Sequence, residues 1–177
     1  MERLETARLI LRPARDADAA DLFEYARDPR VGPIAGWPPH KDHAESLDVI
    51  RTVFAAPGVA VIELKETGKM IGTVGFVDRH RTELPGPDDE IGYALNPAYW
   101  GLGLMPEAVH EVMRHGFETL GLAAIWCGYY DGNDKSRRVV EKSGFRYRFS
   151  CEANVELMGE VRLEHHYALT KEEWLAR

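Results

Sequence analysis

The sequence predicts a mixed α/β fold, in which helices flank a central β-sheet. Segments with apolar residues at every second position alternate with segments that have apolar residues three or four positions apart, the periods of strands and helices. Strand-like segments follow one another in the middle of the chain, and helix-like segments precede and follow them. The length of 177 residues suits one core, so we expect a single domain over residues 1–177.

The N-terminal part predicts one strand and two helices. Apolar residues alternate over 7–14 as in a half-buried strand, which Pro13 ends. A helix follows and stops before Pro29. Its apolar residues at helical spacing are Leu22, Tyr25 and Ala26. A second helix is predicted after Asp42, which stands three residues before Glu45 as in a capping box.

The next two features are a loop and a hairpin. Residues 31–41, between the first two helices, are rich in Pro and Gly and predict a loop that carries Trp37. Residues 58–78 hold two β-rich runs joined by residues 66–69, which predicts a β-hairpin.

The second half of the chain predicts strands that alternate with helices. A strand is expected at 90–95, a helix at 106–122, a short apolar strand at 123–129 and a helix at 133–145 that ends at Gly144. The apolar stripe of the longer helix is Ala108, Val109, Val112, Met113, Phe117 and Leu120. Two further β-rich runs and a short closing helix complete the prediction.

Composition and charge exclude several classes of protein. With 45% hydrophobic and 29% charged residues, neither disorder nor a fibrous repeat is indicated. The net charge of −7 argues against nucleic acid as a partner and suits a basic or amine-bearing one. No run is long enough for a membrane helix, and the N-terminus is too charged for a signal peptide, so we expect a cytoplasmic protein without a membrane partner.

Cysteine and histidine positions predict no metal site. Two cysteines suit free thiols in a reducing compartment, and Cys127, in an apolar run, is expected to be buried and unreactive. His110 and His115 are five residues apart, which places them on different faces of a helix. His165 and His166 would point to opposite faces of a strand.

One short stretch, PAYWGLGLMPEA at residues 97–108, predicts an anion site. Gly101 and Gly103 allow the backbone to turn sharply and a ligand to approach. With Pro106 as the first helical residue, Met105 occupies the cap position, where its side chain offers no acceptor. The first helical amides then lack a side-chain partner, and the positive end of the helix dipole favours phosphate.

Two alternatives bear on this stretch. The helix end could be exposed, with water bound to its amides and glycines that only make the turn. Other phosphate motifs fit less well, because the third glycine of a dinucleotide-binding fingerprint would fall at Pro106 and no Gly-Lys-Ser/Thr sequence is present.

Taken together, EIGYALNPAYWGLGLMPEA (90–108) and NDKSRRVVEKSGF (133–145) resemble the GNAT superfamily of acetyl-CoA-dependent N-acetyltransferases. Within it, the chain looks most like the branch of ribosomal-protein N-terminal (alanine) acetyltransferases, to which TARLILRP (6–13) and YALTKEEW (167–174) are also similar. The resemblance spans nearly the whole chain. It implies a GNAT-type central mixed sheet flanked by helices, acetyl-CoA as cosubstrate, and an amine as acceptor.

The resemblance also implies which residues bind the cosubstrate. The glycine segment would hold the pyrophosphate, and strand backbone would pair with the pantetheine arm as a sheet edge pairs with any extended chain. Asn133 would hold the arm from the other side, and Lys142 would attract the ribose phosphate. The implied residues are Tyr93, Ala94, Leu95, Gly101, Leu102, Gly103, Leu104, Met105, Asn133 and Lys142.

Acetyl transfer needs a neutral amine, a polarised thioester carbonyl and a hydrogen bond for the departing thiolate. We expect Glu90 to take the ammonium proton through a water; the alternative is a solvated acid that follows two aspartates. Val140 stands where many relatives have a tyrosine, so Ser136 is the expected donor to the sulfur. The alternative for Ser136 is a helix-start serine bonded to backbone amides. Tyr129 and Tyr130 are further possible donors.

The acceptor is left open by the sequence. In similar enzymes the loop that carries Trp37 covers the acceptor, so this residue is expected at the pocket rim, with simple loop packing as the alternative. A protein N-terminus, a polyamine-like metabolite, an amino acid and an aminoglycoside-like compound all fit, and either a monomer or a homodimer is compatible. Two other classes compete: a non-catalytic acyl-CoA-binding sensor module and a nucleotide-binding regulator without CoA specificity.

Overall fold

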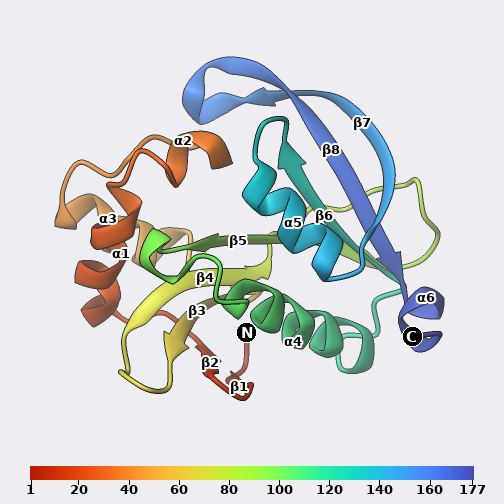
Figure 1. The fold of residues 1–177 in the computed structure, drawn as a ribbon, viewed down its shortest axis with the longest axis horizontal. Coiled ribbons are helices and arrows are strands. Elements are labelled where there is room, and N and C mark those ends of the chain that lie inside the picture. Colours follow the sequence, from red (N-terminus) through yellow and green to blue (C-terminus); the bar gives the residue numbers. More distant parts are fainter.

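Eight strands form one sheet in the order β1-β2-β3-β4-β5-β6-β8-β7, as seen in the computed structural model, which describes residues 1–177 (Figure 1). The strands are Leu4–Glu5 (β1), Leu9–Arg12 (β2), Val59–Leu64 (β3), Met70–Phe76 (β4), Asp88–Leu95 (β5), Ala124–Tyr130 (β6), Arg146–Val155 (β7) and Glu160–Thr170 (β8). The helices are Ala19–Ala26 (α1), Gly32–Ala35 (α2), His43–Thr52 (α3), Leu104–Glu118 (α4), Asp134–Lys142 (α5) and Lys171–Leu175 (α6). The predicted mixed α/β sheet flanked by helices is therefore confirmed.

The sheet splits between β5 and β6. These two strands are the only parallel pair, and they pair only where Asp88–Glu90 lies beside Ala124–Trp126. Beyond Glu90, β5 continues beside β4 while β6 continues beside β8, so the two strands diverge in Figure 1. The backbone at the β6-facing edge of β5 is thus left without a strand partner from Ile91 onwards, and an extended chain can pair with it.

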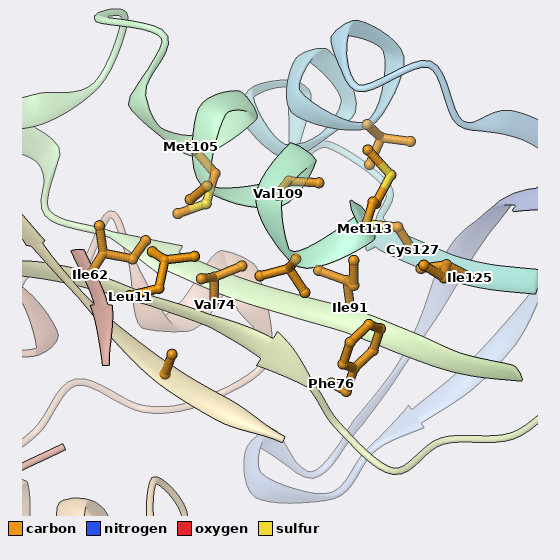
Figure 2. Close-up of a cluster of buried hydrophobic side chains, with 14 of the residues drawn as sticks. Leu11, Ile62, Val74, Phe76, Ile91, Met105, Val109, Met113, Ile125 and Cys127 are labelled. Atoms are coloured by element: carbon orange, nitrogen blue, oxygen red, sulfur yellow. The ribbon is translucent and has the colours of Figure 1, made fainter. Parts of the chain in front are cut away.

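Helix α4 covers one face of the sheet and carries the larger core. Its apolar stripe lies over strand residues such as Ile62, Val74 and Ile91 (Figure 2). The predicted stripe is buried from Ala108 to Phe117, whereas Leu120 lies past the end of the helix and is exposed. Because this stripe is buried, the N-terminus of α4 is held beside the gap that opens between β5 and β6.

Helices α1 and α3 cover the other face of the sheet. Strand residues alternate between the two faces, so Ile62 and Ile71 pack under α4 while Val61 and Met70 pack with the second cluster. Leu22 and Ile50 bring α1 and α3 into that cluster. The two helices thereby form the wall of the molecule on the side of the split opposite α4.

Most predicted elements are present, but two elements were not predicted and several boundaries differ. The capping residue Asp42 accepts from the amide of Glu45, as predicted for α3. However, the loop predicted at 31–41 contains the short helix α2, and β1 was not predicted at all. Helix α4 runs from Leu104 to Glu118, so it begins two residues before the predicted start and ends four residues before the predicted end. No helix is both long and apolar enough to span a bilayer.

Candidate active site

A cavity of about 1280 Å³ follows the split in the sheet. On one side it is lined by the start of α4 and α5, and on the other by residues of α2 and α3 and the loops between them. Its floor includes β5 and β6 residues from both branches of the split, among them Glu90 and Gly128. A ligand that enters beside α4 can therefore meet a second ligand that enters from the α2–α3 side.

The glycine segment before α4 has the expected bends but a different cap. Gly101 and Gly103 have φ angles of 80° and 75°, in the left-handed region that glycine adopts at little cost. The N-cap of α4 is Gly103, not Met105, because the helix starts at Leu104 and includes Met105 and Pro106. A glycine offers no side-chain acceptor at all, so the helix end is uncapped, as expected, at a position two residues earlier.

The unpaired amides are correspondingly those of Leu104 and Met105, which find no acceptor within the protein. The amide of Glu107, the first after Pro106, bonds instead to the carbonyl of Gly103 at 3.3 Å. A Cβ added at Gly101 would meet no atom within 4 Å, so the space above the segment is open. Bare amides, an open approach and the helix dipole together suit a bound pyrophosphate.

Arg8 holds this segment in place, a role that the sequence did not reveal. Its Nη1 donates to the carbonyl of Leu102 at 3.0 Å, and its Nε donates to Glu107 at 2.7 Å. Glu107 also accepts from the hydroxyl of Thr6. Since these partners lie about a hundred residues apart in the chain, no local pattern could have linked them. Leu102 itself does not line the cavity, whereas Gly101, Gly103, Leu104 and Met105 do.

Across the split, Asn133 and Ser136 lie at the start of α5. Asn133 caps the helix, because its Oδ1 accepts from the amide of Ser136 at 3.1 Å. The Oγ of Ser136 lies 2.8 Å from the hydroxyl of Tyr93, which also donates to the carbonyl of Ser136 at 3.3 Å. The predicted alternative, a serine bonded to backbone amides, is therefore wrong. Burial raises the pKa of Tyr93 well above its usual value, so its hydroxyl stays protonated.

Three basic side chains of α5 also line the cavity: Lys135, Arg138 and Lys142. The Nζ of Lys135 lies 4.6 Å from the centre of the Trp100 ring, a cation–π contact across the mouth of the split. Arg30 approaches the same ring at 5.9 Å. Positive charge thus surrounds the part of the cavity that adjoins the glycine segment, although the whole chain is acidic.

Glu90 is buried where the split begins, with a side chain only 7% exposed. The predicted alternative of a solvated acid is therefore wrong. Its Oε1 lies 3.1 Å from Nη1 of Arg79, and its Oε2 lies 2.9 Å from Nη2 of Arg81. Arg81 packs over the rings of Trp126 and Phe149. The two arginines belong to the loop between β4 and β5 and keep this buried carboxylate in an ion-paired state.

A second buried carboxylate, that of Glu164 on β8, lies beside Arg79, the arginine that also contacts Glu90. Oε1 of Glu164 lies 3.4 Å from Nη1 of Arg79, and its Oε2 lies 3.6 Å from Nε2 of His166. Burial raises the pKa of Glu164, and the nearby charge of Glu90 raises it further. Burial also lowers the pKa of His166 to about 4, with a further contribution from Arg81, so this imidazole is neutral near pH 7. Sequence reasoning did not find Glu164, Arg79 or Arg81.

Trp37 lines the cavity, as predicted, and is also packed by its loop. A Cβ at Gly32 would lie 2.5 Å from its ring, so the indole rests on the bare backbone of α2. Its ring centre is 5.5 Å from that of His40. Tyr129 and Tyr130 line the cavity as well, on β6. Cys127 is buried, as predicted, and burial raises the pKa of its thiol.

Comparisons with known proteins fit this geometry. The family model of the acetyltransferase (GNAT) domain matches residues 8–146. The chain is similar to the uncharacterized N-acetyltransferase YoaA of Bacillus subtilis, at 34% identity over 152 residues that cover 81% of this chain and 82% of the relative. It is also similar to the FsC-acetyl coenzyme A-N(2)-transacetylase of Aspergillus fumigatus, at 28% identity over 97% of this chain and 77% of the relative.

Among solved structures, the fold is similar to that of the ribosomal-protein-S5-alanine acetyltransferase from Vibrio fischeri. The TM-score is 0.73 at 23% identity, with 98% of this chain and 99% of the other covered. At this identity the likeness concerns the fold.

Proposed function

The chain belongs to the GNAT family of N-acetyltransferases, and we propose that it moves an acetyl group from acetyl-CoA directly to a primary amine. The observation that carries this proposal is the position of Glu90, buried at the point where β5 and β6 separate and in the same cavity as the bare amides of α4. On this proposal the whole chain acts as one acetyltransferase domain. The comparisons give no support to a non-catalytic acyl-CoA sensor.

The residues at the split fit acetyl-CoA. The amides of Leu104 and Met105 would hold its pyrophosphate, and Lys142 would attract the ribose phosphate. The free edge of β5, from Tyr93 to Leu95, would pair with the pantetheine arm, which Asn133 would contact from α5. When bound, acetyl-CoA supplies an activated acetyl group as a thioester.

Glu90 is the proposed proton acceptor. An amine attacks only in its neutral form, and a carboxylate within reach can take the ammonium proton directly or through a water. The amine nitrogen then forms a bond to the acetyl carbon, and the carbon–sulfur bond breaks with its electron pair left on sulfur. The second proton that the nitrogen loses passes to this thiolate, which leaves as the CoA thiol. No activated Cys or Ser nucleophile flanked by a base lines the cavity, which supports direct transfer.

Ser136 is the proposed donor to the departing sulfur. When Tyr93 donates its hydroxyl proton to Oγ of Ser136, the hydrogen of Ser136 is free to point into the cavity. Tyr93 thus serves as a positioning residue on this proposal. The substitution of the usual helix tyrosine by Val140, which is fully buried, is consistent with a donor elsewhere.

The acceptor is proposed to be a primary amine with Trp37 at the rim of its channel. Two relatives named above act on different amines according to their names, an N(2) group of FsC and the alanine of a ribosomal protein. A cationic acceptor suits the negative charge of this chain.

The test is calorimetry with acetyl-CoA followed by thiol release in the presence of a panel of amines. The panel should contain peptide N-termini, polyamines, amino acids and aminoglycosides. We expect binding of acetyl-CoA and release of CoA with at least one amine, with the acetylated amine detected by mass spectrometry. Binding without turnover on any amine would contradict the proposal and favour the sensor, and equal competition by ATP would favour the nucleotide-binding regulator.

A further inference from the structure

Glu90 and Glu164 share one cationic group. Nη1 of Arg79 lies 3.1 Å from Oε1 of Glu90 and 3.4 Å from Oε1 of Glu164. Both carboxylates are buried, with side chains 7% and 9% exposed, and both line the cavity. One positively charged nitrogen between two buried carboxylates is also what a primary ammonium would provide.

Arg79 and Arg81 are not equivalent in this cluster. Arg81 is 14% exposed, packs over Trp126 and Phe149, and holds the other oxygen of Glu90. The side chain of Arg79 is half exposed and lines the cavity, and its guanidinium lies over no aromatic ring. Its backbone is fixed separately, because its amide donates to Asp89. Arg79 can therefore swing its guanidinium into solvent at little packing cost, whereas Arg81 cannot.

The charge balance of the cluster indicates that another cation would have to take the place of Arg79. Two carboxylates and two guanidinium groups balance, so withdrawal of Arg79 leaves one negative charge uncompensated in a buried place. Such a charge is costly unless another cation pairs with it. Gly128 leaves the carboxylate of Glu164 uncovered on the cavity side, since a Cβ at that position would crowd Oε1 of Glu164 at 3.0 Å.

We propose that the acceptor binds as an ammonium ion that displaces Nη1 of Arg79 and bonds to Oε1 of both Glu90 and Glu164. This inference rests on the proposed function and narrows its substrate class to amines that carry a positive charge before they react. Glu164 is then an acceptor-binding residue, and Arg79 occupies the ammonium site until the acceptor arrives. After binding, one N–H bond breaks and its proton passes to Glu90, which leaves the nitrogen lone pair free to attack.

The test compares Glu164→Gln and Arg79→Met with the wild type. The acceptor affinity is measured by amide chemical shifts in CoA-saturated protein during titration with n-butylammonium chloride, so turnover is not required. Glu164→Gln should weaken this binding about 10-fold, the loss expected for a charge-assisted hydrogen bond. Arg79→Met should tighten it up to about 10-fold, because the competing side chain is gone.

Matched controls separate this effect from a general loss of charge or of folding. Arg114 also lies between two glutamates, at 2.6 Å from Glu111 and 3.0 Å from Glu118, but on the surface of α4, outside the cavity. Arg114→Met and the exposed Glu152→Gln should leave the affinity unchanged. Tetramethylammonium has no N–H group and should bind far more weakly than butylammonium to the wild type.

The outcomes are distinguishable from those of the proposed function. Unchanged or weaker butylammonium binding in Arg79→Met, with the fold intact by circular dichroism, would overturn the inference even if acetyl transfer proceeds normally. An unchanged affinity of Glu164→Gln for butylammonium would also overturn the inference. If the shifts occur as expected but no amine is acetylated, the ammonium site stands and the proposed reaction fails.

Discussion

The two halves of the cavity are built in different ways. The half proposed for the cosubstrate, here the cosubstrate half, consists mainly of backbone from one continuous stretch, where Gly101 and Gly103 turn the chain and α4 begins with bare amides. The half proposed for the acceptor, here the acceptor half, consists of side chains from separate elements, with Glu90 on β5, Glu164 on β8 and Arg79 on the loop after β4. A site made of backbone amides depends on the conformation of the chain. A site made of buried charged side chains depends on each charge having a partner of opposite sign.

This difference predicts different consequences for substitution. A change in the acceptor half should alter catalysis and acceptor binding while acetyl-CoA still binds. A change in the glycine segment should weaken acetyl-CoA binding while the charge cluster stays intact.

Glu90→Gln should have the largest effect. Loss of the proton acceptor should lower kcat by about 10²- to 10⁴-fold, the usual contribution of a general base. The dissociation constant of acetyl-CoA, measured by calorimetry, should stay within about 2-fold of the wild type, since Glu90 contacts neither the glycine segment nor α5. A parallel loss of acetyl-CoA affinity would mean that the two halves are not independent.

The stability of the acceptor half should depend on pH through His166. Its pKa is lowered from 6.5 to about 4 in the folded protein. As pH falls from 6.5 towards 4, the unfolded chain binds a proton that the folded one resists, so the free energy of unfolding falls by roughly 2 to 3 kcal/mol. Urea denaturation at several pH values should show this loss, and His166→Gln should remove it. If the free energy of unfolding of His166→Gln fell equally with pH, groups other than His166 would account for the loss of stability.

Gly101→Val should weaken acetyl-CoA binding by about 10-fold, because a β-branched residue disfavours the φ of 80° that the bend needs. Gly121→Val is the matched control: its φ is 71°, and a Cβ at either glycine meets nothing within 4 Å. Both variants should lose about 1 to 2 kcal/mol of stability by thermal denaturation. Only Gly101→Val should lose affinity, and equal affinity in both would contradict a role for the bend.

Tyr93→Phe should have the smallest effect, since Tyr93 acts only through Ser136. Loss of one hydrogen bond of 2.8 Å should lower kcat about 3- to 10-fold. Ser136→Ala should lower kcat at least as much, and Tyr93→Phe should add little in the double variant because the two act as a unit. If the losses in kcat of the two single variants added up in the double variant, Tyr93 would act independently of Ser136, which would contradict its proposed role.

The same contrast explains what the sequence could predict. The uncapped helix end and the strand at 90–95 depend on neighbouring residues, so local patterns located them, whereas the cap of α5 by Asn133 was not predicted. The start of α4 was misplaced by two residues, because proline prefers the first helical position but also fits the third, where its missing N–H is still unneeded.

The acceptor half could be predicted only in part. Glu90 was expected from its place beside the cosubstrate strand, but its burial and its two arginine partners depend on how the β4–β5 loop folds back. Glu164 joins this cluster because β8 pairs with β6, a contact between strands more than thirty residues apart. No spacing in the sequence encodes such a meeting of charges. Arg8 beside Leu102 is the corresponding long-range contact in the cosubstrate half.

The most direct test of the central claim is a titration of ¹⁵N-labelled protein with acetyl-CoA, followed by backbone amide chemical shifts. The account predicts the largest shifts at the amides of Leu104 and Met105 and along β5 from Ile91 to Leu95, with the turn between β3 and β4, at residues 65–69, unaffected. Shifts confined to other regions, with the amides at the start of α4 unchanged at saturation, would contradict it.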